Sequence, residues 1–106
     1  MTKAYVDDIR QYRTDVNEQA VAAIVKHLGI ALKSADASLV SCSSKTELAR
    51  VRDSWLKKKL GLTADDAALD KAVLDVCTAM KGEGKKSRVT FYYLLADTLG
   101  KLGALA

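Results

Sequence analysis

The sequence contains no proline and only six glycines. Sandwiches and barrels of β-strands need turn residues every few positions, because each strand is short and the chain must reverse after it. Alanine, leucine, lysine and aspartate are abundant instead, and this mixture suits helices better than strands. The composition therefore argues against an all-β fold and favours an all-α one.

Long apolar runs are also missing. No stretch reaches the roughly 18 apolar residues that a membrane-spanning helix requires. Near the N-terminus, Asp7 and Asp8 stand where a signal peptide would place its apolar region. We therefore predict a cytoplasmic protein that has no membrane partner.

Metal ligands and nucleophiles are scarce, with two cysteines and one histidine in the chain. This set does not match any recognised zinc-ligand spacing, so we predict no metal and no cofactor. Cys42 and Cys77 are expected as buried thiols, because a reducing cytoplasm disfavours the disulfide that their spacing leaves open. Cys42 precedes a predicted helix N-terminus, which favours a thiolate, and His27 is the one candidate base. Without a third, orienting residue, this pair is a weak basis for catalysis, and we predict that the protein is not an enzyme.

The chain of 106 residues corresponds to one domain, residues 1–106. Apolar residues at helical spacing predict a helix over residues 4–12, a second ending at Leu28, and a third over residues 45–60. A fourth ends near Met80, and a fifth covers residues 88–99. Short turns are expected at Asp36 and in a loop containing Gly82 and Gly84.

Capping residues support these boundaries. Ser44 and Glu47 form the S-x-x-E pattern of a capping box, and side-chain caps are also expected at Asp15 or Asn17, at Thr63 with Asp66, and at Ser87. Three predicted helices end at Leu-Gly pairs, whose glycines are Gly29, Gly61 and Gly100. Glycine at this position takes the left-handed conformation that terminates a helix.

The predicted fifth helix is apolar around almost its whole circumference. Residues 89–95 also have strand propensity, but they do not alternate polar with apolar residues and the run continues to a glycine stop. An all-round apolar helix is buried, so this one is either central or shared with a second subunit. Candidate interface residues on it are Phe91, Tyr92, Leu94 and Leu95.

Positive charge is concentrated in short stretches of the chain. Residues 45–60 contain six bases and two acids, whereas residues 61–80 contain one base and four acids. At 100° per residue, Lys45, Arg52 and Lys59 form a row inside the apolar arc of the third helix. Arg88, at the start of the fifth helix, is a fourth candidate.

Two interpretations of this basic row remain open. The row of Lys45, Arg52 and Lys59 with Arg88 would bind phosphate or nucleic-acid backbone. Alternatively, the row pairs with Asp66 and Asp70 of the next helix, which is the interpretation that we favour because helix pairs of complementary charge are common. A DNA-binding helix-turn-helix is disfavoured, since its recognition helix would be acidic.

Five segments resemble a family of small bacterial proteins catalogued as a domain of unknown function, DUF2853. They are residues 26–32, 38–43, 47–52, 57–62 and 86–96. The resemblance implies a compact bacterial helical protein and brings no activity, cofactor or catalytic residue.

Together these features predict an all-α, compact bundle of about five helices with a central C-terminal helix. The function we expect is that of a non-enzymatic protein-interaction or structural module that self-associates as a homodimer. The alternative is nucleic-acid or phosphate-ligand binding through the basic row.

Overall fold

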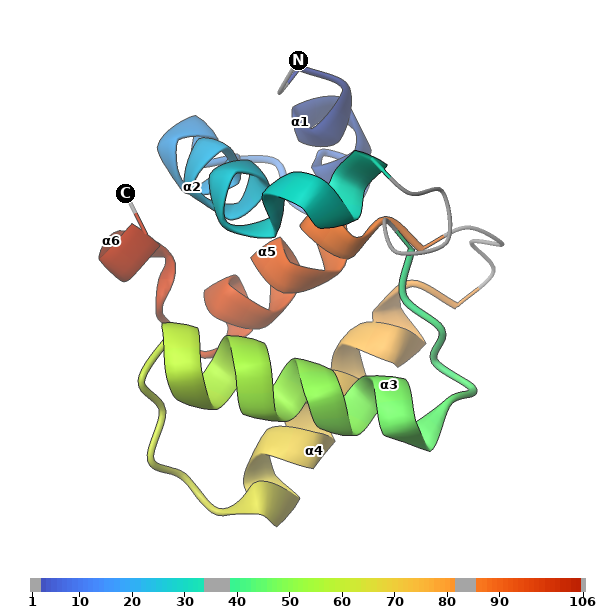
Figure 1. The fold of residues 1–106 in the computed structure, drawn as a ribbon. Helices are drawn as coiled ribbons and strands as arrows, with labels where there is room; N and C mark the ends of the chain where they lie inside the picture. The colour runs from blue at the N-terminus through green and yellow to red at the C-terminus, as the bar shows by residue number, and fades with distance from the viewer. Residues whose placement is uncertain (1–2, 34–38, 82–85, 106) are drawn as a thin grey trace.

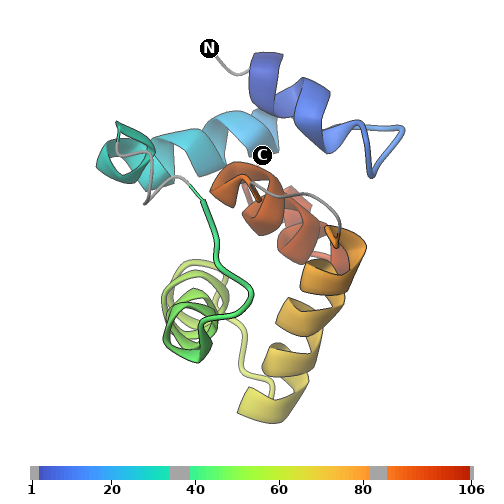
Figure 2. The ribbon, with the colours of Figure 1, turned by 90° about the vertical axis from the view of Figure 1, so that its right-hand side faces the viewer.

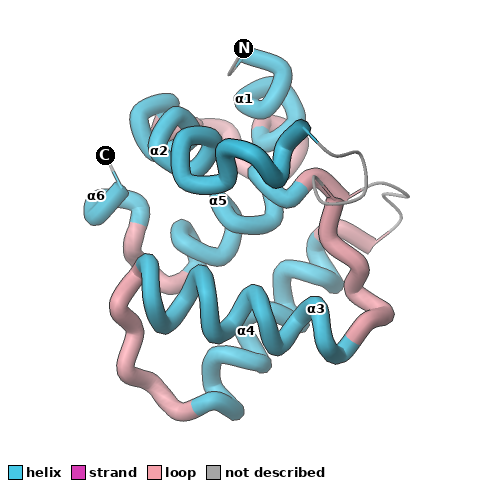
Figure 3. The backbone as a smooth tube through the Cα atoms, in the orientation of Figure 1, coloured by secondary structure: helices cyan, strands magenta, loops and turns pink. Residues whose placement is uncertain are grey.

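The computed structural model describes residues 3–33, 39–81 and 86–105, and these residues are helices joined by loops (Figure 1). Figure 3 shows the same pattern along the backbone. The elements in chain order are α1 (Lys3–Ile9), α2 (Glu18–Leu28), the 3₁₀ helix η1 (Gly29–Lys33), α3 (Lys45–Arg50), the π-helix η2 (Val51–Lys59), α4 (Asp66–Ala79), α5 (Arg88–Thr98) and α6 (Leu102–Leu105). The all-α prediction is confirmed. The turn expected at Asp36 and the glycines Gly82 and Gly84 lie outside the described residues.

Helix α5 is the centre of the bundle. It contacts α1, α2, α4 and α6 (Figure 1), and every residue from Val89 to Ala96 is buried. The turned view in Figure 2 shows α1 and α2 on one side of α5, with α3 and α4 on the other. The predicted central helix is therefore confirmed, although it is not the last one, because the short helix α6 follows it and packs on α2.

Polar groups on α5 are satisfied by neighbouring elements. The buried Thr90 hydroxyl donates to Asp8 just before the end of α1, and the Tyr93 hydroxyl accepts a 2.8 Å hydrogen bond from the backbone N–H of Asn17. Trp55 of η2 stacks on Tyr92 at 4.6 Å between ring centroids, and its indole N–H donates to the Tyr92 carbonyl over 3.2 Å. These contacts let a helix without a polar face fill the core, since buried polar groups need partners.

Several predicted caps are present and others differ. Asn17 caps α2 by accepting from the Ala20 N–H, and Ser44 caps α3 by accepting from the Glu47 N–H. Helix α4 begins at Asp66 with Asp65 at its N-cap, so the predicted Thr63 cap is wrong. The three glycines after the Leu-Gly helix ends all have positive φ, as the C-terminal motif requires: Gly29, Gly61 and Gly100.

The third predicted helix is continuous but changes its geometry. Its second half, η2, is a π-helix, in which hydrogen bonds join residues five apart and each residue turns through a smaller angle than in an α-helix. Its buried residues follow this wider repeat, at spacings of four, one and four positions: Val51, Trp55, Leu56 and Leu60. The 100° repeat on which the predicted row of Lys45, Arg52 and Lys59 depends therefore ends at Val51, and η2 has one broad apolar stripe.

Candidate functional site

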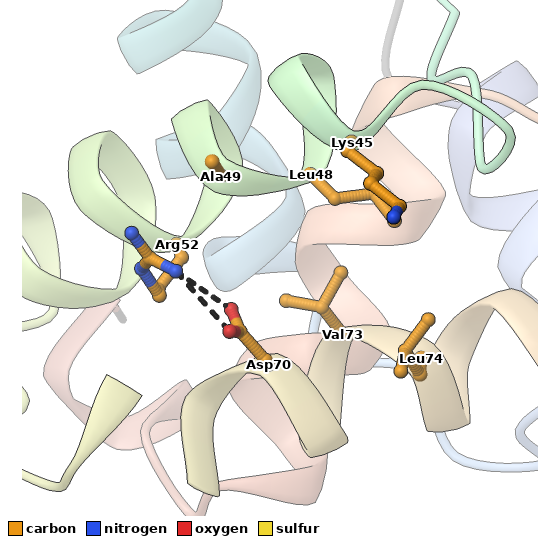
Figure 4. Close-up of a pocket in the computed structure, with 7 residues that line it drawn as sticks. All are labelled: Lys45, Leu48, Ala49, Arg52, Asp70, Val73 and Leu74. Carbon is orange, nitrogen blue, oxygen red and sulfur yellow. Dashed lines mark hydrogen bonds and ion pairs between the residues drawn. The ribbon is translucent and has the colours of Figure 1, made fainter. Parts of the chain in front are cut away.

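An open groove lies between α3–η2 and α4, with a volume of about 340 Å³. It is lined mainly by apolar side chains, with charged groups toward its two ends (Figure 4). One wall is Lys45, Leu48, Ala49 and Arg52, and the other is Asp70, Val73 and Leu74. Both walls follow spacings of three and one along the chain, which bring side chains to a single face of a helix.

Leu74 distinguishes this groove from the rest of the surface. It is 54% exposed, and it is the single exposed large apolar side chain among the residues that the structure describes. The buried face of α4 consists of Leu69, Ala72, Val73 and Val76, so Leu74 lies beside that face and not on it. A leucine outside the apolar stripe of a helix is a sequence signal of an exposed apolar residue, and this signal was not used for Leu74 at the level of the sequence.

One end of the groove is closed by ion pairs. The Arg52 guanidinium donates to both oxygens of Asp70, at 3.0 and 3.2 Å, and lies 3.9 Å from Asp66. A further 3.0 Å bond joins Arg52 to Asp53. Hydrogen bonds with Asp53 and Asp70 raise the pKa of Arg52 above its ordinary value, so this cation stays charged and engaged. The favoured interpretation, in which the basic row pairs with Asp66 and Asp70, is confirmed for Arg52 alone, because neither Lys45 nor Lys59 contacts these acids.

Lys57, which is not part of the predicted basic row, belongs to the same network. Its ammonium contacts Asp66 and lies 3.8 Å from Asp53. The hydrogen bond from Lys57, followed by the nearby charge of Arg52, lowers the pKa of Asp66. Lys57 reaches this position because it follows Arg52 by five residues, which is one turn of the π-helix.

The other end of the groove holds Lys45 and Leu74 (Figure 4). Lys45 has no ion-pair partner among the described residues. Just beyond this end, Cys42 and Cys77 form a disulfide with their Cα atoms 6.0 Å apart. The expectation of two buried thiols is therefore wrong, since both residues are partly buried and bonded to each other.

The three cations of the predicted basic row do not lie on one face of the helix. Lys45 and Arg52 both line the groove, but Lys59 does not. Lys59 lies close enough to His27 of α2 to act on its charge. Seven residues make nearly two whole turns of an α-helix, but not of a π-helix, so the change at Val51 rotates Lys59 away from Arg52.

Arg88 is held in an internal cluster. Its guanidinium contacts Glu47 and donates to the Leu39 carbonyl over 3.0 Å and to the Tyr92 hydroxyl over 3.3 Å. Burial alone would lower the pKa of Arg88, but the bonds to Tyr92 and Glu47 raise it above its ordinary value. Burial also raises the pKa of the Tyr92 hydroxyl. Glu47 therefore neutralises Arg88 and does not complete the predicted capping box.

The candidate interface residues on α5 are used inside the chain. Their exposed fractions are at most 5% for Phe91, Tyr92, Leu94 and Leu95. Of the two positions proposed for the apolar helix, central or shared between subunits, the structure has the central one. An interface with a second copy therefore has to use another surface.

The candidate nucleophile Cys42 and the candidate base His27 have different contacts in the structure. Cys42 is in the disulfide, and the ring of His27 packs 5.2 Å from that of Trp55. Burial, and then the charge of Lys59, lower the pKa of His27. Within residues 3–33, 39–81 and 86–105, no group of three His, Cys, Asp or Glu side chains is arranged to hold a metal ion. None of the described helices combines the length and apolar character needed to cross a membrane.

Comparison with known proteins places nearly the whole chain in one family. A family model described as "Protein of unknown function (DUF2853)" matches residues 4–103. The search of curated proteins found no match. The resemblance seen in five segments of the sequence is thus confirmed, and the geometry of the groove has to supply the functional argument.

Proposed function

We propose that the chain, which belongs to the DUF2853 family, is a non-enzymatic interaction module that forms a homodimer through the groove between α3–η2 and α4. The observation that carries this proposal is the exposure of Leu74 at the rim of an apolar groove. Fully burying an exposed leucine side chain contributes about 1.5–3 kcal/mol, and Leu74 is 54% exposed, so completing its burial on both subunits gives association a driving force of roughly this size.

A second copy of the chain is the occupant that the charges favour. The two walls of the groove have opposite character, since residues 45–60 are basic and residues 61–80 are acidic. At the Arg52 end these charges already neutralise each other, whereas Lys45 at the Leu74 end has no ion-pair partner within residues 3–33, 39–81 and 86–105. A surface with one basic and one acidic wall is complementary to itself when two copies meet about a twofold axis.

This symmetry brings specific residues together. Leu74 of each subunit would enter the groove of its partner, between Leu48 and Val73. Asp75 follows Leu74 on α4 and is exposed, with a single 3.3 Å contact to Lys71 one turn away. Asp75 of each subunit would then approach Lys45 of the other and provide a carboxylate that the described part of its own chain does not offer it.

The anion-binding alternative has less support. Of its four candidate residues, Arg52 and Arg88 are engaged with carboxylates, and Lys59 lies away from Lys45. Phosphate would have to displace these carboxylates, which a charge-assisted bidentate bond resists. Nucleic-acid binding and cytoplasmic location both stay predictions of the sequence.

Sedimentation velocity over a wide concentration range tests the proposal. The wild-type protein is expected to shift from monomer to dimer as its concentration rises. Leu74→Asp should weaken this dimer by about a hundredfold or more, because each dimer loses two buried leucines and gains two buried charges. Ala68→Asp is the matched control, since it places the same carboxylate at an exposed position of α4 that does not line the groove.

Two results would refute the proposed dimer. One is a wild-type protein that stays monomeric at the highest concentration reached. The other is a dimer that Leu74→Asp and Ala68→Asp affect equally, which would place the interface elsewhere. Fluorescence anisotropy with labelled oligonucleotides, run on the same samples, distinguishes the alternative: binding at physiological salt that Leu74→Asp does not alter would favour an anion site.

A further inference from the structure

The disulfide lies at the open end of the groove and joins its two walls. Cys42 precedes Lys45 by three residues, and Cys77 follows Leu74 by three residues on the same face of α4. The covalent loop that it closes spans 35 positions and contains α3, η2 and α4, which are both walls of the groove. Breaking this bond releases one wall from the other at the Lys45–Leu74 end.

Contacts other than the disulfide also hold the segment before α3 in place. The Val40 N–H donates to the Lys86 carbonyl over 2.9 Å, and Arg88 bonds to the Leu39 carbonyl. On the far side of the disulfide, Glu47 is anchored by Arg88. These contacts bracket residues 41–46, so loss of the disulfide frees a short segment that includes Lys45 and leaves the bundle around α5 in place.

Both cysteines are within reach of a reductant. Each is only partly buried, and Cys42 stands in a loop whose neighbours Ser41 and Ser43 are exposed or half-exposed. An accessible disulfide exchanges with thiols, whereas a fully buried one does not. A reducing cytoplasm, which the sequence predicts, would hold this pair as thiols until an oxidant appears.

We propose that Cys42 and Cys77 form a reversible dithiol–disulfide switch that sets the geometry of the groove between α3–η2 and α4. The reductant is a dithiol. Its thiolate attacks one sulfur of the Cys42–Cys77 bond to give a mixed disulfide, and its second thiol then displaces that sulfur. Two electrons and two protons pass to Cys42 and Cys77, and the dithiol leaves as a disulfide. A small-molecule disulfide such as oxidised glutathione reverses the step.

The effect on association rests on the proposed function. In the oxidised protein, Lys45 and Leu74 are held on opposite walls at a fixed separation, ready to meet a second copy. In the reduced protein, the segment that contains Lys45 has to be ordered on binding, and this ordering weakens association. Oxidation should therefore favour the dimer, with an affinity about tenfold or more above that of the reduced protein.

Two measurements on the full chain test the switch separately from the dimer. Hydrogen exchange with mass spectrometry compares protein oxidised by glutathione disulfide with protein reduced by dithiothreitol and capped with iodoacetamide. Faster exchange on reduction is expected in residues 41–50 and 73–77, with α1, α2 and α5 unchanged. The Cys42→Ser/Cys77→Ser variant should match the reduced protein without reductant, and it controls for the bulk of the alkyl groups.

The exchange and reduction measurements each have outcomes that would overturn the proposed switch. Unchanged exchange in both segments after complete reduction would overturn it, as would a folded protein whose disulfide resists dithiothreitol or never forms. Loss of protection throughout the chain would overturn it as well, because the bond would then be needed for folding and would not act as a switch. Local loosening without any dimer in either state would confirm the switch and refute the proposed dimer.

Discussion

At the scale of single residues, two of the four candidate cations have carboxylate partners. Arg88 and Arg52 are both neutralised by carboxylates, on Glu47 and on Asp70. Lys45 and Lys59 have no ion-pair partner among the described residues, and of these two only Lys45 lines the groove, at the end that holds Leu74. Composition reveals the basic excess, whereas which cations find partners depends on how the helices pack.

The pH dependence of the free energy of unfolding tests the environment of His27 in the folded chain. Burial and Lys59 lower its pKa in the folded chain below the ordinary value of 6.5. Between the folded and unfolded pKa values the unfolded chain binds more protons, so the free energy of unfolding rises with pH across this window. We predict that stability falls as the pH is lowered through and below 6.5, down to the folded pKa.

Chemical denaturation at closely spaced pH values measures this effect. His27 is the one histidine of the chain, so a His27→Gln variant should remove the slope in that window. Carboxylates such as Asp66, whose pKa is lowered, act only at more acidic pH and are retained in the variant. A slope of the same size in His27→Gln would show that another group is responsible.

At the scale of elements, the π-helix η2 decides which cations act together. Sequence reasoning assumed 100° per residue through Lys59, and this assumption produced the row of Lys45, Arg52 and Lys59. The nine residues of η2 turn more slowly, so Val51, Trp55 and Leu60 share one buried face. A π-helix has no simple sequence signature, since it forms where packing of large side chains stabilises the wider turn.

Charge reversals at the two ends of η2 test this geometry. Arg52→Glu should lower the free energy of unfolding, because it places a carboxylate beside Asp53, Asp66 and Asp70. Lys59→Glu should change stability by less than about 0.5 kcal/mol, since Lys59 is exposed and has no ion-pair partner among the described residues.

Denaturation at low protein concentration, where the monomer dominates, gives both values. The α-helical row predicts similar losses for Arg52→Glu and Lys59→Glu, because both cations would face α4. Equal destabilisation would therefore contradict the π-helical arrangement. Lys59→Glu has a second expected effect, which is a higher pKa of His27, because the cation that lowers this pKa is replaced by an anion.

The helices themselves were largely predictable, for identifiable physical reasons. Asn17 and Ser44 cap helices as their residue types indicate, and glycines with positive φ end α2 and α5. These are local interactions that depend on a few neighbouring residues. The groove was not predictable, because Leu48 and Leu74 are separated in the chain and meet only through the crossing of two helices.

At the scale of the whole molecule, the buried central helix changes where association has to occur. The sequence offered α5 as an interface because an all-round apolar helix must be covered. The other helices of the same chain cover residues Val89 to Ala96, and the exposed large apolar side chain among the residues that the structure describes is Leu74. The same folding brings Cys42 and Cys77 together, which spacing alone left open. In the chain-entropy description, a loop of this length contributes about 4 kcal/mol to stability.

Mixing two charge-reversed variants tests the proposed twofold dimer, in which Lys45 of each subunit meets Asp75 of the other. In Lys45→Glu alone or in Asp75→Lys alone, like charges face each other at both contacts, so each variant should dimerise more weakly than wild type. When the two are mixed in equal amounts, a heterodimer has opposite charges at both contacts.

Native mass spectrometry of the mixture, with one variant labelled by ¹⁵N, counts homodimers and heterodimers in a single spectrum. If Lys45 and Asp75 meet across the interface, the heterodimer should dominate and its affinity should return toward that of wild type. Heterodimer at the statistical proportion, or no association in the mixture while wild type dimerises, would contradict the contact between Lys45 and Asp75 and with it the proposed interface.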